Sequence, residues 1–178
     1  MKITAIRHTS VEVLPGICYG QSDVTTKSSF NKESETVSRN INGNLFDVVY
    51  SSPLTRCRKL AERLFPGKPV FFDERLKELN FGDWELKSWD EIYATNEGQT
   101  WMDNYQVLPT LNGESYPEME GRVRDFVQTL KQRNSENIAI VTHAGVIRIL
   151  KSIITGTPVS ELFDSFKPDY GSITKFEL

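Results

Sequence analysis

The sequence contains two histidines, His8 and His143, and each one directly follows a short apolar run that predicts a buried β-strand. These predicted strands are Lys2–Ile6 and Ile138–Val141. Because the strands of an open α/β sheet bind ligands at their carboxyl ends, both imidazoles are expected at one site. Histidine serves as a nucleophile, acid or base near neutral pH. A lone histidine is more often structural, but this matched placement favours a catalytic pair.

Two arginines accompany the histidines. Arg7 immediately precedes His8, and Arg56 follows another predicted strand, Phe46–Tyr50, at the end of the segment Ser51-Ser-Pro-Leu-Thr-Arg56. An arginine on a helix is usually a solvated surface charge, but the tight Ser-Pro turn indicates a fixed position in the first turn of a helix. Guanidinium groups offer planar, bidentate donors that suit phosphate oxygens. The four side chains could therefore hold a phosphoryl group.

A carboxylate that could transfer protons lies in the aromatic-rich segment of residues 76–85. A carboxylate in a loop usually faces solvent. The pattern of the residues alone does not distinguish Glu78 from Glu74, Asp83 or Glu85.

Strands alternate with helices along the chain, which predicts an α/β domain with a largely parallel sheet. Residues 74–112 form a longer stretch than a crossover connection needs, so we expect an insertion that serves as a lid or pocket wall. The predicted strands are Lys2–Ile6, Phe46–Tyr50, Pro69–Phe72, Ile138–Val141 and Ile173–Phe176. The predicted helices are Leu54–Leu64, two that begin with capping boxes at Ser88 and Ser115, and Gly145–Ile154, which Gly156 ends.

Length and composition indicate an ordinary globular protein, because 178 residues suit one domain, 1–178. The net charge of −3, without long charged runs, argues against nucleic acid or an anionic membrane as the main partner. No apolar stretch approaches the roughly 20 residues of a membrane helix. Cys18 and Cys57 form no C-x-x-C pattern, so a disulfide framework or zinc site is not expected, and a reducing, cytoplasmic setting is favoured.

Four motifs in order resemble those of the histidine phosphatase superfamily, in its phosphoglycerate-mutase-like branch. They resemble the family's Arg-His-Gly, Ser-Ser-x-x-x-Arg, Glu-x-x-Phe-Gly-x-Trp-Glu-Gly and His-Gly/Ala-Gly motifs, and they span nearly the whole chain. Any one of them would be a weak signal, whereas four in the family's order are specific. In this sequence they are Arg7-His8, Ser51-Ser-Pro-Leu-Thr-Arg56, Glu78-Leu-Asn-Phe-Gly-Asp-Trp-Glu85 and His143-Ala-Gly145.

The resemblance implies a three-layer sandwich around a mostly parallel sheet and a phosphatase without metal or cofactor. It implies that His8 attacks phosphorus and forms a phosphohistidine. Arg7, Arg56 and a protonated His143 would stabilise the phosphoryl group. Glu78 would be the general acid, so it must carry a proton when the substrate binds.

A narrower resemblance links Arg7-His8-Thr-Ser-Val and Cys18-Tyr-Gly-Gln-Ser-Asp23 to alpha-ribazole phosphatases, which act late in cobalamin synthesis. Two positions depart from the superfamily pattern. Thr9 replaces the glycine after the nucleophile, as is common in the alpha-ribazole group. Leu86 replaces the glycine after Trp-Glu, so the loop is expected to turn differently. Additional phosphate contacts are expected from Gln21 and Ser22, and stacking on a flat substrate group from Tyr19, Trp84 and Trp101, although such aromatics also serve as plain core.

Other functions remain open at this stage. A phosphoglycerate mutase carries the same motifs but is generally longer, and a phosphohistidine protein phosphatase usually lacks most of the insertion. A broad-specificity phosphatase of the same superfamily is a further alternative. A non-enzymatic phosphate-binding module should lack at least one of Arg7, His8, Arg56 and His143, and all are present. The oligomeric state is not indicated.

Overall fold

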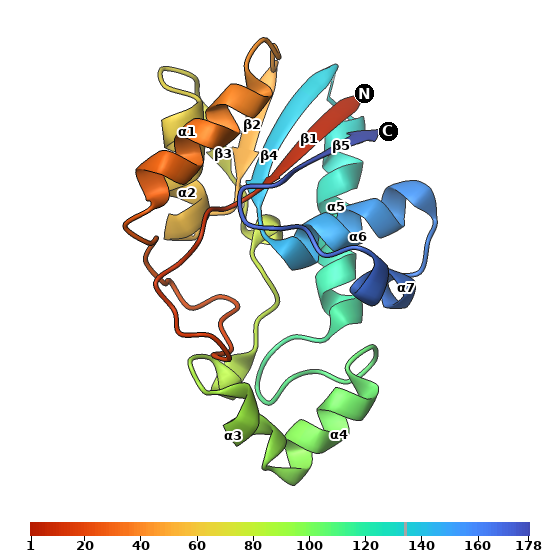
Figure 1. Cartoon of the computed structure of the whole chain (residues 1–178). Helices are drawn as coiled ribbons and strands as arrows, with labels where there is room; N and C mark the ends of the chain where they lie inside the picture. Colours follow the sequence, from red (N-terminus) through yellow and green to blue (C-terminus); the bar gives the residue numbers. More distant parts are fainter. Residues whose placement is uncertain (134) are drawn as a thin grey trace.

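The computed structural model describes residues 1–133 and 135–178, and within them five strands form one mixed sheet (Figure 1). The spatial order is β3-β2-β4-β1-β5, and β5 alone runs antiparallel to its neighbour. The strands are β1 (Lys2–Arg7), β2 (Val48–Ser51), β3 (Val70–Phe72), β4 (Asn137–Thr142) and β5 (Ile173–Glu177).

The central strands β1 and β4 are covered on both faces. Ile3, Ala5, Ile138 and Ile140 are fully buried on one side of the sheet. Strands buried on both faces have continuous apolar sequences, which is why these two were recognisable as uninterrupted runs.

Helices cover both faces of the sheet, so the predicted three-layer α/β architecture is confirmed (Figure 1). Helices α1 (Phe30–Ile41) and α2 (Thr55–Leu64) pack on the face that carries Val49 and Val141. Helices α5 (Tyr116–Lys131) and α6 (Ala144–Thr155) pack on the opposite face. The sandwich places the carboxyl ends of β1, β2 and β4 at one edge, where the connecting loops meet.

Residues 74–112 contain two 3-10 turns, η1 (Glu74–Leu76) and η2 (Gly82–Trp84), and two short helices, α3 (Trp89–Tyr93) and α4 (Asn96–Asn104). In Figure 1 this segment lies beyond the carboxyl ends of the parallel strands. Stacked rings of Trp89 and Trp101, with centroids 6.3 Å apart, hold it together. Its function as a lid stays a prediction.

The helix boundaries reflect local sequence signals. The capping boxes at Ser88 and Ser115 are both formed, each with the glutamate three residues later. Gly156 ends α6 with a φ of 74°, the left-handed conformation that glycine adopts without steric cost. Helices α1 and α4, together with α7 (Val159–Ser165), were not among our sequence-based predictions. Within the part of the chain that the structure describes, no helix is long and apolar enough to cross a membrane.

Candidate active site

The five residues predicted to be catalytic line one cavity of about 220 Å³ at the carboxyl edge of the sheet. The register of the sheet brings them there, because Arg7 at the end of β1 pairs with Thr142 at the end of β4. The next residues along each strand are the two histidines, whose ring centroids lie 5.2 Å apart. The five residues are Arg7, His8, Arg56, Glu78 and His143.

A larger cavity, of about 640 Å³, lies at the opposite edge of the sheet and contains none of these residues. Its polar lining includes Lys2, Asn137 and Lys175, and none of its lining residues is a histidine, an arginine or a cysteine. The chemistry-bearing side chains therefore identify the smaller cavity as the candidate active site. Among residues 1–133 and 135–178, no group of three or more histidine, cysteine, aspartate or glutamate side chains is placed to hold a metal ion.

His8 is almost fully buried and has a defined tautomer. Its Nδ1 lies 2.7 Å from the carbonyl oxygen of Thr9, and a carbonyl can only accept, so Nδ1 carries the hydrogen. In the neutral imidazole the lone pair then lies on Nε2. Burial lowers the pKa of His8 well below its usual 6.5, with Arg56 as the second cause, so the ring is neutral at neutral pH. This protonation state is the one that a nucleophile requires.

His143 precedes the first residue of α6 and is fully buried. Its Nε2 lies 2.9 Å from the hydroxyl oxygen of Ser52, which follows the neighbouring strand β2. Burial, followed by Arg56 and His8, lowers the pKa of His143 well below 6.5. The expectation of a protonated His143 is therefore wrong for the pocket without substrate, because a buried imidazolium beside cationic groups is unfavourable.

The two arginines each keep a buried donor without a protein partner. Arg56 is fully buried, and its terminal nitrogens donate to the carbonyl oxygens of Gly20 and Ser22. Arg7 donates to the carbonyl oxygen of Pro168 at 2.7 Å. Neither Nε has a hydrogen-bond partner among the described residues. An unsatisfied buried donor costs roughly 1–3 kcal/mol. Both guanidinium groups line the cavity, where their positive charges favour an anion.

Glu78 reaches the amino end of α6. Its Oε2 accepts from the backbone N–H of Gly145 at 3.1 Å, and its Oε1 accepts from the N–H of Leu79 at 3.1 Å. A Cβ on residue 145 would lie 2.1 Å from Oε1, so only glycine permits this approach. The His-Ala-Gly segment thus supplies both an imidazole and the space for the carboxyl group.

Gln21 and Ser22 make hydrogen bonds to Glu85 and Glu78. The backbone N–H groups of Gly20, Gln21 and Ser22 and the Ser22 hydroxyl all donate to the carboxylate of Glu85, at 2.6–3.0 Å. Burial raises the pKa of Glu85, but these hydrogen bonds outweigh it and the net shift is downward. The Gln21 side chain donates to the Glu78 carbonyl oxygen. Neither Gln21 nor Ser22 is among the residues that line the cavity, because Glu85 holds this loop against the insertion. Their contact with phosphate stays a prediction.

Of the three aromatics expected to stack on substrate, only Tyr19 lines the cavity as the structure describes it. Trp84 is 3% exposed, and its ring centroid lies 5.4 Å from that of Trp101. That prediction is therefore wrong for Trp84 and Trp101, which form the core of the insertion. Leu86 has a φ of 66°, a left-handed conformation that glycine adopts without steric cost. The expectation that the loop turns differently there stays a prediction.

A family model described as "Histidine phosphatase superfamily (branch 1)" matches residues 3–178. The chain belongs to this superfamily. It is 28% identical to "Putative phosphoserine phosphatase 2" of Hydrogenobacter thermophilus, over 99% of this chain and 89% of the relative. It is 25% identical to the adenosylcobalamin/alpha-ribazole phosphatase of Escherichia coli, over 96% of this chain and 87% of the relative. Family membership and these phosphatase relatives make the chain a phosphoric monoester hydrolase.

The fold of this histidine phosphatase matches a solved structure closely. The alpha-ribazole phosphatase from Shigella flexneri has a TM-score of 0.93 with 24% sequence identity, covering 100% of this chain and 91% of that chain. The expected phosphoglycerate-mutase-like fold is therefore confirmed.

Apart from Tyr19, the far wall of the histidine phosphatase cavity was missed by sequence-based reasoning. It consists of apolar and aromatic side chains that come from three separate segments, together with one cation, Arg148 of α6. No local pattern marks such residues, because each stands in a segment whose apolar positions also build the core. The apolar and aromatic members are Ile17, Tyr19, Leu79, Phe81, Trp89 and Tyr116.

The two buried imidazoles should make this histidine phosphatase less stable as the pH falls. Because the pKa values of His8 and His143 lie below 6.5 in the native state, the unfolded chain takes up protons that the native state does not bind. Between about pH 7.5 and 5.5 the free energy of unfolding should fall by about 1.4 kcal/mol per imidazole. Urea unfolding at these pH values measures the loss.

The variant His8→Asn serves as the control, because it should show about half of the wild-type loss. Carboxyl groups such as Glu85, whose ordinary pKa is 4.5, titrate below this window. A free energy of unfolding that is level across the window would contradict the assignment of two neutral, buried imidazoles.

Proposed function

We propose that this histidine phosphatase hydrolyses a phosphate monoester with a flat aromatic leaving part, through a phosphohistidine on His8. The substrate that fits best is alpha-ribazole 5'-phosphate, a benzimidazole nucleotide of cobalamin synthesis. The observation that carries the proposal is that one cavity combines two cations, Arg7 and Arg56, with a set of aromatic side chains.

In the first step, the lone pair on Nε2 of His8 attacks phosphorus, and the bond from phosphorus to the leaving oxygen breaks. The transferring phosphoryl group is loose and strongly negative, so positioning and charge stabilisation are the main contributions of the protein. The guanidinium groups of Arg7 and Arg56, which line the cavity, are suited to bind its oxygens. The arriving dianion also raises the pKa of His143, which lets that imidazole donate to the phosphoryl group.

Glu78 acts as the general acid and then as the general base. Its proton passes to the leaving alkoxide as the ester bond breaks. In the second step the carboxylate takes a proton from water, and the hydroxyl oxygen attacks the phosphohistidine. The phosphorus–nitrogen bond breaks, which returns His8 to its neutral form and releases inorganic phosphate. Support comes from the location of the carboxyl group beside the N–H of Gly145, two residues from His143.

The aromatic wall favours a flat, apolar leaving part. Tyr19, Phe81, Trp89 and Tyr116 line the same cavity as the two arginines. Offset or edge-on ring contacts contribute about 0.5–1.5 kcal/mol each beyond buried area. A benzimidazole ring would use this surface, whereas an aliphatic amino acid would leave it in contact with water.

Phosphoserine is the second candidate. Arg148 is a cation within the cavity, and a cation suits a substrate that carries a carboxylate in addition to phosphate. The cavity volume of about 220 Å³ also suits a small substrate. A relative named as a phosphoserine phosphatase shares 28% identity with the chain. These observations favour a compact, doubly anionic substrate.

The nucleophile is tested with para-nitrophenyl phosphate in the presence of EDTA. Hydrolysis should survive chelation, since the proposed charge stabilisation comes from arginine and histidine. His8→Ala should lower kcat by about 10³-fold or more, as removal of a covalent nucleophile commonly does. No hydrolysis by the wild type across a series of monoesters would instead favour a phosphate-binding module.

Glu78→Gln tests the acid. Glutamine keeps the size and accepts a hydrogen bond but has no proton to transfer at this position. On alkyl phosphates, whose leaving oxygens are strongly basic, kcat should fall by about 10²–10⁴-fold, the range typical for general acid–base catalysis. On para-nitrophenyl phosphate the loss should be much smaller. Equal losses on both kinds of ester would remove Glu78 from this role.

The substrate is tested by comparing kcat/KM for alpha-ribazole 5'-phosphate, phosphoserine, 3-phosphoglycerate and a phosphohistidine peptide. The alpha-ribazole ester should be preferred, and Trp89→Leu should lower its kcat/KM by about 3- to 10-fold, the value of one ring contact. Arg148→Met should have little effect on that ester. A preference for phosphoserine that Arg148→Met abolishes would support the second candidate.

A further inference from the structure

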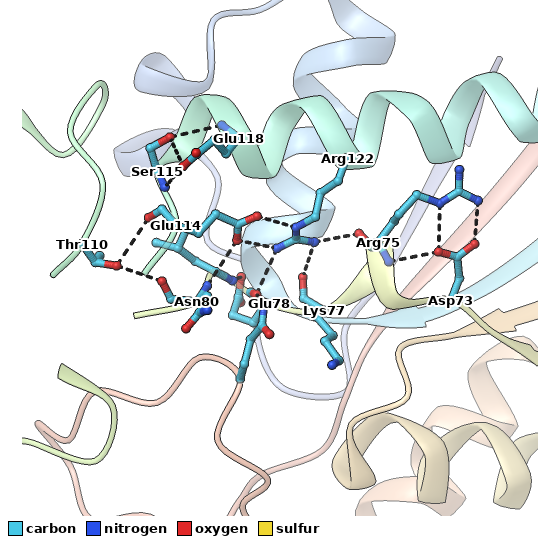
Figure 2. Close-up of polar contacts among 12 residues, drawn as sticks. Asp73, Arg75, Lys77, Glu78, Asn80, Thr110, Glu114, Ser115, Glu118 and Arg122 are labelled. Atoms are coloured by element: carbon cyan, nitrogen blue, oxygen red, sulfur yellow. Dashed lines mark hydrogen bonds and ion pairs between the residues drawn. The ribbon is translucent and has the colours of Figure 1, made fainter. Parts of the chain in front are cut away.

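Arg122 is a half-buried residue of α5 that has no place in the steps above, yet it uses all of its hydrogen-bond donors. The guanidinium group has five N–H bonds. Figure 2 shows it between the carboxylate of Glu114 and the backbone of the segment that carries Glu78. Its five contacts are to Glu114 twice and to the carbonyl oxygens of Arg75, Lys77 and Glu78.

The contacts are short and divide the guanidinium into two halves. Nε and Nη2 donate to the two carboxylate oxygens of Glu114, at 2.6 and 2.8 Å. Nη1 donates to the Arg75 and Lys77 carbonyl oxygens, both at 2.7 Å, and Nη2 donates to the Glu78 carbonyl oxygen at 3.0 Å. One side chain therefore fixes the backbone of residues 75–78, a stretch that ends at Glu78 itself.

We propose that Arg122 is a positioning residue, which sets where the carboxyl group of Glu78 meets the leaving oxygen of the substrate. This inference rests on the proposed function of Glu78 as the general acid. Arg122 does not line the cavity in the part of the chain that the structure describes, so it acts through the backbone. Among the described residues, the Glu78 side chain accepts hydrogen bonds from backbone N–H groups alone, so the direction of its own backbone decides where the carboxyl group lies.

Glu114 fixes the guanidinium group of Arg122 from the other side. It directly precedes the capping box of α5 at Ser115, so its backbone is held by the start of the helix (Figure 2). Its Oε2 also accepts from the N–H of Asn80, and its N–H donates to the Asn80 carbonyl oxygen. The segment that carries Glu78 is therefore attached to α5 on both sides of the acid.

An ion pair made only for stability would need the contacts to Glu114 alone, whereas Arg122 also donates to three backbone carbonyl groups. The side chains of Arg122 and Glu114 are 18% and 14% exposed. The neighbouring pair of Arg75 and Asp73, with 32% and 18% exposure, offers a control. The Arg75 side chain bonds to Asp73 and Thr129 but makes no contact with the backbone of residues 77 and 78.

The experiment compares Arg122→Met with Arg75→Met, each in the full chain. Methionine keeps much of the apolar stem of arginine and removes the donors. The substrates are para-nitrophenyl phosphate, phenyl phosphate and an alkyl phosphate, in order of increasing leaving-group basicity. Arg122→Met should lower kcat on the alkyl ester by about 10- to 100-fold, the scale of a 1 Å misplacement. On para-nitrophenyl phosphate, the loss should stay near the small loss expected for Arg75→Met.

Two further measurements separate positioning from general damage. KM for para-nitrophenyl phosphate and inhibition by inorganic phosphate should not change in Arg122→Met, because the phosphate end is not touched. In the double variant with Glu78→Gln, the Arg122 change should add no further loss, because residues that act as one unit are non-additive. Glu114→Gln keeps one acceptor for Arg122, so it should show the same leaving-group dependence with a smaller loss of kcat. This variant replaces Arg122→Met if Arg122→Met does not fold.

The outcomes distinguish this inference from the function on which it rests. A loss in Arg122→Met that is equal on all three esters, or that adds fully to Glu78→Gln, overturns the positioning role while Glu78 stays the acid. If Glu78→Gln itself shows no leaving-group dependence, the acid assignment fails first, and the inference fails with it. A steeper leaving-group dependence in Arg122→Met, absent in Arg75→Met and in the double variant, supports the inference.

Discussion

The parallel pairing of β1 with β4 is the constraint on which the site depends. Arg7 stands opposite Thr142 in this ladder, so the chain leaves both strands at the same height and the histidines follow side by side. Apolar side chains on both faces of these strands fix the register, because a slip by one residue would displace every one of them from its core position. Apolar packing in the sheet thus determines where the polar side chains of the site lie at its edge.

The site that results is unfavourable when it is empty. Two buried arginine Nε donors lack partners, and the same positive charges help burial to keep both imidazoles neutral. A dianion in the cavity would pair with the positive charges and oppose the lowering of the histidine pKa values at once. In the proposed mechanism, substrate binding and proton uptake by His143 are therefore linked, so that this imidazole becomes charged only when a phosphoryl group is there to accept its hydrogen bond.

How much of this could be predicted from sequence depended on whether the signal was local. The strands before His8 and His143 were evident from apolar runs, and the capping boxes at Ser88 and Ser115 from residue spacing. The cavity wall was not predictable, because Trp89 and Trp84 stand five residues apart in one aromatic segment and only the tertiary packing turns one to the cavity and the other to the core. The choice of Glu78 came from family resemblance alone, since the neighbouring carboxylates look alike in sequence.

Arg56 and Arg122 show why residue type alone does not reveal function. Both lie on helices, Arg56 in the first turn of α2 and Arg122 near the middle of α5, and both hold neighbouring loops through backbone carbonyl groups. Arg122 also faces a carboxylate and uses every donor, so it has no capacity left for a ligand. Arg56 has no carboxylate partner among its hydrogen bonds and keeps a buried donor free. An arginine suited to bind phosphate therefore differs from one that holds the backbone in the number of donors that the protein leaves unpaired. This number is decided by residues far away in the sequence.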